Sequence, residues 1–131
     1  MEVSARLRFL QASAQKVRLV ADLIRGKDVQ EASNILRLTR KGVSKDLGKL
    51  LKSAIANAEN RDENVDVDRL YVKEIFVDGG PMLKRIRPAT MGRAFRVLKR
   101  QSHVTIRLDT RKVAVDKKSS TRAPRKSRKT A

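Results

Sequence analysis

Positively charged side chains are concentrated in one stretch of this sequence, and they are the residues best suited to bind a ligand, because they can bind anions. Seven of them lie between Gly79 and His103, where no acid occurs: Lys84, Arg85, Arg87, Arg93, Arg96, Lys99 and Arg100. Arginine can donate two hydrogen bonds from its planar guanidinium to a phosphate, whereas lysine supplies a point charge. We therefore expect this stretch to bind a polyanion, mainly through phosphate rather than base-specific contacts.

Charge is unevenly distributed along the chain. The 131 residues contain 32 Lys or Arg and 14 Asp or Glu, a formal net charge of +18. Residues 1–78 hold 15 basic and 12 acidic side chains (net +3), residues 79–115 hold ten and one (net +9), and residues 116–131 hold seven and one (net +6). This pattern predicts a nearly neutral folding unit with two basic extensions. The polyanion could be a nucleic acid or a membrane surface.

The residue types needed for catalysis or metal binding are scarce. Cysteine is absent and His103 is the single histidine, so thiolate chemistry and polyhistidine metal sites are excluded. No Gly-rich phosphate loop is present. The acids between Asp62 and Asp68 lack EF-hand spacing and indicate a solvated loop. We expect no enzymatic activity, no metal and no cofactor. No apolar run approaches the ~18 residues of a membrane span, so we expect no membrane-spanning segment.

The elements that carry these residues follow from hydrophobic periodicity. Residues 3–9 alternate apolar and polar, which predicts a strand with Arg6 and Arg8 facing outward. Apolar stripes predict a helix over 14–25, a short helix that begins at residue 29, and a third helix around 47–58. β-branched and aromatic residues predict a strand at 70–77, and alternating apolar residues predict another at 104–108. The sequence thus predicts an α+β domain over residues 1–115, with three helices packed on a small antiparallel sheet of about three strands.

The basic stretch is expected to form a long β-hairpin over about residues 80–102. Gly79-Gly80-Pro81 marks the end of the preceding strand, and Pro88 and Gly92 bracket a turn. Each arm of about nine residues would reach roughly 30 Å. A two-stranded hairpin is marginal in water, so a bound polyanion would have to stabilise it. The alternative is a solvated, disordered basic loop.

Further cations could form a second basic face on the first strand and helix: Arg6, Arg8, Lys16, Arg18 and Arg25. The alternative is an ordinary solvated surface. Arg111 and Lys112 extend the set beyond the last strand. Residues 116–131 have too little apolar content to fold alone and are expected to form a disordered basic tail.

Four further side chains are candidates for RNA contact or core packing. His103 could contact RNA or fill a strand position, and Phe95 is a candidate for stacking on a base. Phe9 and Phe76 are expected in the core.

Residues in the basic stretch also carry a family pattern: Gly80-Pro81, Lys84-Arg85, Pro88, Gly92-Arg93-Ala94, Lys99-Arg100 and Ser102-His103-Val104-Thr105. Ser13-Ala14-Gln15-Lys16-Val17-Arg18, its continuation through Arg25-Gly26, and Ser53–Ala58 agree with it. Over residues 3–109 the sequence resembles ribosomal protein twenty-two of the bacterial-type large subunit. Two positions depart from the pattern: Pro88 is followed by Ala89-Thr90 instead of Arg-Ala, and Gln101 replaces a threonine.

The resemblance implies a structural protein that binds large-subunit rRNA and supports subunit assembly. Its body would lie near the polypeptide exit tunnel, with neighbouring ribosomal proteins. Its hairpin would line the tunnel wall and meet the nascent polypeptide. The tip, associated with the tunnel constriction and with macrolide response, comprises Arg87, Pro88, Ala89, Thr90, Met91, Gly92 and Arg93. The expected location is the cytoplasmic ribosome, with an organellar ribosome left open, and neither a membrane partner nor a homo-oligomer is expected. The alternative function is a basic DNA-architectural protein.

Overall fold

The computed structural model describes residues 2–62 and 65–111. Its helices and strands follow the predicted order: β1 (Glu2–Leu10), α1 (Ala14–Ile24), α2 (Val29–Leu38), α3 (Val43–Arg61), β2 (Leu70–Pro88) and β3 (Ala94–Thr110). Two short 3-10 turns, Val67–Arg69 and Thr90–Gly92, flank β2. The predicted α+β class is confirmed. The predicted tail and Lys112 lie outside the described residues.

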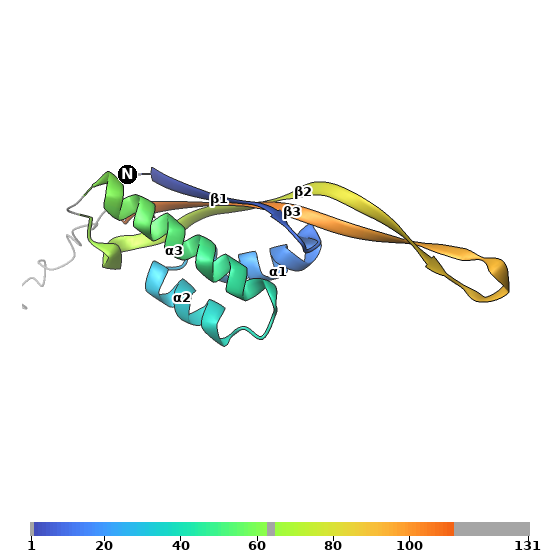
Figure 1. Ribbon diagram of the computed structural model, residues 1–131. Coiled ribbons are helices and arrows are strands. Elements are labelled where there is room, and N and C mark those ends of the chain that lie inside the picture. The colour runs from blue at the N-terminus through green and yellow to red at the C-terminus, as the bar shows by residue number, and fades with distance from the viewer. Residues whose placement is uncertain (1, 63–64, 112–131) are drawn as a thin grey trace, which may run out of the picture.

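The sheet is antiparallel, with β3 in the middle and the strand order β1-β3-β2. The three helices cover one of its faces, and the far end of the β2–β3 pair projects beyond them (Figure 1). β1 runs alongside β3 from the pair Glu2–Asp109 to the pair Leu10–Ser102 and goes no further. The central position of β3 therefore anchors the projecting hairpin on both sides at its base.

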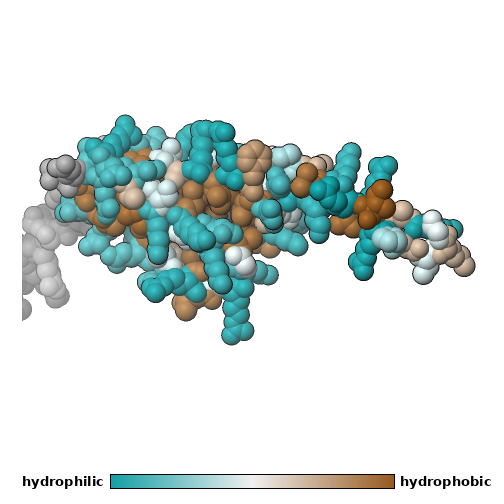
Figure 2. Space-filling view, in the orientation of Figure 1, coloured by the Kyte–Doolittle hydropathy of each residue, from teal (hydrophilic) through white to brown (hydrophobic). Residues whose placement is uncertain are grey.

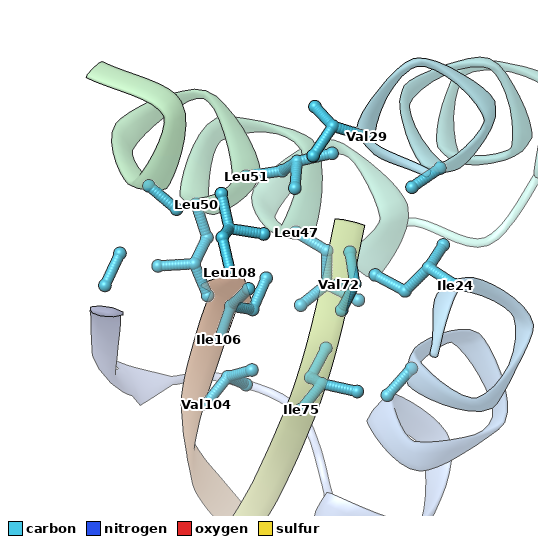
Figure 3. Packing of buried hydrophobic residues seen from close by; sticks show 14 of the residues in the cluster. Ile24, Val29, Leu47, Leu50, Leu51, Val72, Ile75, Val104, Ile106 and Leu108 are labelled. Carbon is cyan, nitrogen blue, oxygen red and sulfur yellow. The ribbon is translucent and has the colours of Figure 1, made fainter. Parts of the chain in front are cut away.

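The core lies between the sheet and the helices (Figure 3). The predicted helix stripes form it, since Val17, Val20 and Ile24 of α1 and Leu47, Leu51 and Ala54 of α3 are all almost completely buried. They meet the sheet residues Val72, Val104, Ile106 and Leu108, which are also fully buried. Because this cluster contains no residue from 78–101, the body has a core of its own that does not depend on the hairpin.

The structure extends two predicted boundaries. The helix expected around 47–58 is longer, because α3 begins at Val43 and continues to Arg61. The strands expected over 70–77 and 104–108 are parts of the longer β2 and β3. Gly26 adopts φ +75°, as the predicted helix C-terminus requires. Its N–H donates to the Val72 carbonyl at 2.9 Å, which ties the end of α1 to the sheet.

The prediction that Phe9 and Phe76 lie in the core is wrong, because they are 57% and 44% exposed. β-bulges explain both errors. The β1–β3 register shifts between Leu7 and Leu10, and Phe9 has φ +57°. On β2 the register shifts between Val72 and Glu74, which moves Phe76 to the outer face. A bulge reverses the inside–outside alternation of the residues after it.

The predicted hairpin is formed by the ends of β2 and β3. After a register shift between Gly79 and Met82, the two strands pair without β1 from Met82–Arg100 to Pro88–Ala94. At the tip, the Ala89 N–H donates to the Arg93 carbonyl at 2.8 Å. Met91 and Gly92 follow with φ of +59° and +68°.

Among the described residues, no helix is both long and apolar enough to cross a membrane. In the same part of the chain, no group of three or more His, Asp or Glu side chains is placed to hold a metal ion.

Candidate nucleic-acid interface

Six of the seven cross-strand pairs of the hairpin combine one cation with one apolar residue, and the seventh, Pro88–Ala94 at the tip, is uncharged. The six pairs are Met82–Arg100, Leu83–Lys99, Lys84–Leu98, Arg85–Val97, Ile86–Arg96 and Arg87–Phe95. Like charges directly opposite each other destabilise a strand pair, and this register avoids every such pairing. Because facing residues share a face and successive residues alternate, each side of the ribbon carries three of these cations. Phosphates could therefore be bound from both sides.

Five of the six apolar partners on the hairpin are exposed, and Val97 is half-buried. Met82, Leu83, Phe95 and Leu98 are between 39% and 65% exposed, and Ile86 is 76% exposed. Figure 2 shows hydrophilic and hydrophobic residues interspersed along the visible face of the hairpin. A surface of this kind can contact sugars and bases with its apolar groups while its cations contact phosphates.

The hairpin cations have no acidic partner among the described residues. Arg100 Nη1 contacts the Met82 sulfur at 3.3 Å, and Arg85 Nη1 donates to the neighbouring Lys84 carbonyl at 3.0 Å. Beyond Arg87 and Arg93 the tip carries no charge, and Met91 at its end is 94% exposed. The seven cations thus remain available for an external anion.

Two cations of the predicted second basic face connect α1 to β2. Arg18 donates from Nε and Nη2 to the Val77 carbonyl at 3.3 and 2.9 Å. Arg25 pairs with Asp22 at 2.6 Å and donates to the Ile75 carbonyl at 3.2 Å. Both positions have a structural role in the chain itself, and their contact with RNA remains a prediction.

Arg6, Arg8 and Lys16 are exposed, and no described acid pairs with them. They do not share one face, because Arg6 and Arg8 lie on β1 beside the outer side of the sheet, whereas Lys16 lies on α1. Lys16 lies on a groove of about 960 Å³ between the start of α1 and the hairpin base, with Lys99 and Arg100 on its other side. The structure therefore brings Lys16 of the first helix together with two cations of the hairpin, Lys99 and Arg100. Arg111 instead pairs with Asp28 at 3.4 Å and lies over the Tyr71 ring at 5.7 Å.

His103 has a definite partner at the hairpin base. Its Nδ1 accepts the Phe9 N–H at 3.0 Å, and the two rings meet edge to face with centroids 4.9 Å apart. Since Nδ1 is an acceptor, the proton of the neutral ring lies on Nε2, which can donate to a ligand.

A further basic surface, which the sequence prediction missed, lies where α2 ends and α3 begins. We call it the α2–α3 corner; its cations are Arg37, Arg40, Lys41, Lys45, Lys49 and Lys52. They surround a groove of about 660 Å³, and no described residue forms an ion pair with them. Residues 37–52 contain a single acid, Asp46. A charge count over this short window would have found the surface, whereas the average over residues 1–78 hid it.

Paired cations gather at the other end of the sheet. Lys73 lies 3.3 Å from Asp109 and 3.6 Å from Glu2, and Arg107 lies 3.1 Å from Glu74. The hydrogen bond to Asp109, followed by the charge of Glu2, raises the pKa of Lys73. The cations at this end of the sheet therefore have acidic partners, whereas those on the hairpin and the α2–α3 corner have none among the described residues.

Comparison with known proteins gives a family and close relatives. The family model described as ribosomal protein L22p/L17e matches residues 5–109. A Caldicellulosiruptor saccharolyticus protein is 56% identical over 84% of this chain and 89% of its own length. Proteins of Solibacter usitatus and Geobacter sulfurreducens are 51% and 53% identical, over 82% and 81% of this chain and 96% and 95% of their own lengths. All three are named large ribosomal subunit protein uL22. The chain therefore belongs to the ribosomal protein L22p/L17e family.

Proposed function

We propose that the chain is a structural, non-enzymatic constituent of the large ribosomal subunit in the cytoplasm, and that it binds large-subunit rRNA. The hairpin register carries the proposal. Six successive cross-strand pairs each combine a cation with an apolar residue, and no described acid neutralises the cations. The names of the relatives, all large-subunit proteins, support the same assignment.

Energetics explain why rRNA is the partner that this hairpin needs. A two-stranded ribbon is marginal in water, and mutual repulsion among seven cations lowers its stability further. Phosphates bound on both faces would remove that repulsion and supply charge-assisted hydrogen bonds. The hairpin then folds stably only within the RNA, whereas the body is held by its own core.

The same geometry supports a place along the polypeptide exit tunnel. The hairpin is long, narrow and anchored at one end of the body (Figure 1). In the proposed arrangement the body lies near the tunnel mouth, beside neighbouring ribosomal proteins, and the hairpin lines the wall. The exposed tip, with Met91 at its end, would meet the nascent polypeptide. By holding several RNA segments at once, the chain would also support subunit assembly. It would act as a single copy rather than a homo-oligomer.

The α2–α3 corner extends the proposed RNA contact to the helical layer of the body. Its six cations lie around one groove without acidic partners in the described part of the chain. A phosphate backbone matches this charge.

Co-sedimentation with purified large subunits under increasing salt tests the proposal. We expect the tagged chain to remain bound after a high-salt wash. A variant with Arg85, Arg87 and Arg96 changed to Gln should dissociate at lower salt, because each lost phosphate contact reduces the salt slope by about 0.7–0.9. The matched control changes Lys27, Arg69 and Lys73 to Gln, which removes the same charge from cations that have acidic partners.

Equal release of the two variants would contradict a specific role for the hairpin. Recovery of the chain only with bulk DNA would contradict the ribosomal function and favour a DNA-architectural protein.

A further inference from the structure

The outer face of the sheet, on the side away from the helices, carries a hollow near the hairpin base. Its volume is about 480 Å³, and its lining includes Arg6, Phe9, Phe76, His103, Thr105 and Arg107. We call it the outer-face hollow. It contains two of the chain's three phenylalanines, both substantially exposed. Their exposure makes this the aromatic surface of the body.

Strand register explains how the hollow forms. Arg6, Thr105 and Phe76 lie in one row across β1, β3 and β2. The small Thr105 forms the floor between two long side chains. Along β3, His103 and Arg107 lie two residues to either side of Thr105 and thus on the same face. The bulge in β1 turns Phe9 outward, where it packs against His103 with a centroid distance of 4.9 Å.

The flat groups of the hollow are held in place before any ligand arrives. The Arg107 guanidinium lies over the Phe76 ring, 5.4 Å from its centre, and pairs with Glu74 at 3.1 Å, so one face of the ring already has a planar cation against it. His103 is fixed by the Phe9 N–H on its Nδ1, which leaves Nε2 as a donor. Rigid flat groups of this kind lose little entropy when a planar ligand stacks on them.

We propose that the outer-face hollow binds one unstacked nucleotide of an RNA, with its base against Phe76. Every nucleobase has a flat face that stacks on aromatic side chains. Arg6 and Arg8, which also lines the hollow, would contact the adjoining phosphates. Asp78, the one acid in the lining, would accept a hydrogen bond from an exocyclic amine of the base. This assignment rests on the proposed rRNA binding and adds a specific nucleotide site to it.

A fluorescent RNA tests the site on the full-length chain. The probe is a single-stranded 12-nucleotide RNA with 2-aminopurine at its centre, compared with the same RNA in a duplex. We expect the chain to quench the single-stranded probe by stacking. Phe76→Ala should bind the single strand about tenfold more weakly, which corresponds to about 1.4 kcal/mol. Its affinity for the duplex and its salt slope should not change, since no phosphate contact is lost.

Matched variants separate stacking from loss of folding. Phe76→Tyr keeps the ring and should retain quenching. Leu19→Ala removes an apolar side chain that is 61% exposed on α1, outside the hollow, and should bind like the wild type. Thermal unfolding shows whether each variant is folded. An unchanged affinity of folded Phe76→Ala, or an equal loss on duplex RNA, would overturn the proposal.

Ultraviolet cross-linking in purified large subunits tests the site in the particle. We expect a nucleotide adduct on the peptide that contains Phe76 or on the one that contains Phe9. Attachment of these peptides to another protein instead would overturn the nucleotide site and leave the ribosomal function intact. If the chain does not associate with large subunits at all, both proposals fail.

Discussion

Arg18 and Lys16 lie two residues apart on α1, yet Arg18 has a partner within the described chain and Lys16 has none. The guanidinium of Arg18 reaches the Val77 carbonyl just below the hairpin base. Lys16 points to the groove shared with Lys99 and Arg100. Of these two neighbouring cations, Arg18 therefore stabilises the fold, whereas Lys16 is accessible to an anion.

Replacing Arg18 should therefore lower the stability of the folded chain more than it weakens RNA binding. We expect Arg18→Ala to lower the free energy of unfolding by about 1 kcal/mol, because a charged donor to a half-buried carbonyl is lost. Lys16→Ala is the control and should unfold like the wild type. Urea denaturation of the isolated chain measures both. Equal stability of the two variants would show that Arg18 contributes nothing to the fold.

Side-chain orientation was the least predictable property at this scale. Phe9 and Phe76 fit the alternation of their strands, so the sequence placed them in the core. Two bulges turned them outward, because one extra residue reverses which face a side chain takes. A bulge depends on the pairing of distant strands, and no local pattern marked it. The hairpin cations had no such ambiguity, since a two-stranded ribbon exposes both faces.

At the scale of elements, the register of the hairpin keeps cations away from one another. Lys84 faces Leu98, and on the other face Arg85 faces Val97. The sequence predicted the hairpin and its turn from glycine and proline residues, namely Gly-Gly-Pro at 79–81, Pro88 and Gly92. It did not predict the alternating pairing, because pairing requires the register, which depends on the size of the tip and on the bulge at the hairpin base.

A charge inserted opposite a hairpin cation should weaken the hairpin. In Leu98→Lys, the new ammonium faces Lys84, which should cost about 0.2–1 kcal/mol. Because the free hairpin is marginal, this change alters the folded fraction measurably. Cross-strand nuclear Overhauser effects between residues 82–88 and 94–100 report it. The double variant Lys84→Leu, Leu98→Lys exchanges the two groups and should restore the signal. An equal loss in the double variant would mean that repulsion is not the cause.

Close packing at the hairpin base gives a second test at this scale. A Cβ on Gly80 would lie 3.1 Å from the backbone carbon of Gln101, whereas one on Gly79 would meet nothing within 4 Å. Gly80→Ala should destabilise the hairpin by about 1 kcal/mol through overpacking. Gly79→Ala should be neutral or slightly stabilising, since it only restricts the unfolded chain. Chemical shifts of residues 82–100 distinguish the variants, and identical shifts would refute the close contact.

The whole molecule consists of a body with its own core and a projecting hairpin that we propose to bind rRNA. The body follows from sequence to a large degree, because its helix stripes are regular and their apolar residues form one core. The α2–α3 corner was missed because its cations, all within residues 37–52, were averaged into the near-neutral charge of residues 1–78. Charge segregation along the chain therefore describes the hairpin correctly and understates the basic surface of the body.

Amide hydrogen exchange over residues 82–100, compared between the isolated chain and purified large subunits, tests the central claim most directly. If rRNA stabilises the hairpin, these amides should exchange in the free chain within about tenfold of unstructured peptide rates and should be strongly protected in the particle, while buried amides of α3 are protected in both. Strong protection of the hairpin in the free chain, or equal exchange in both states, would contradict the claim.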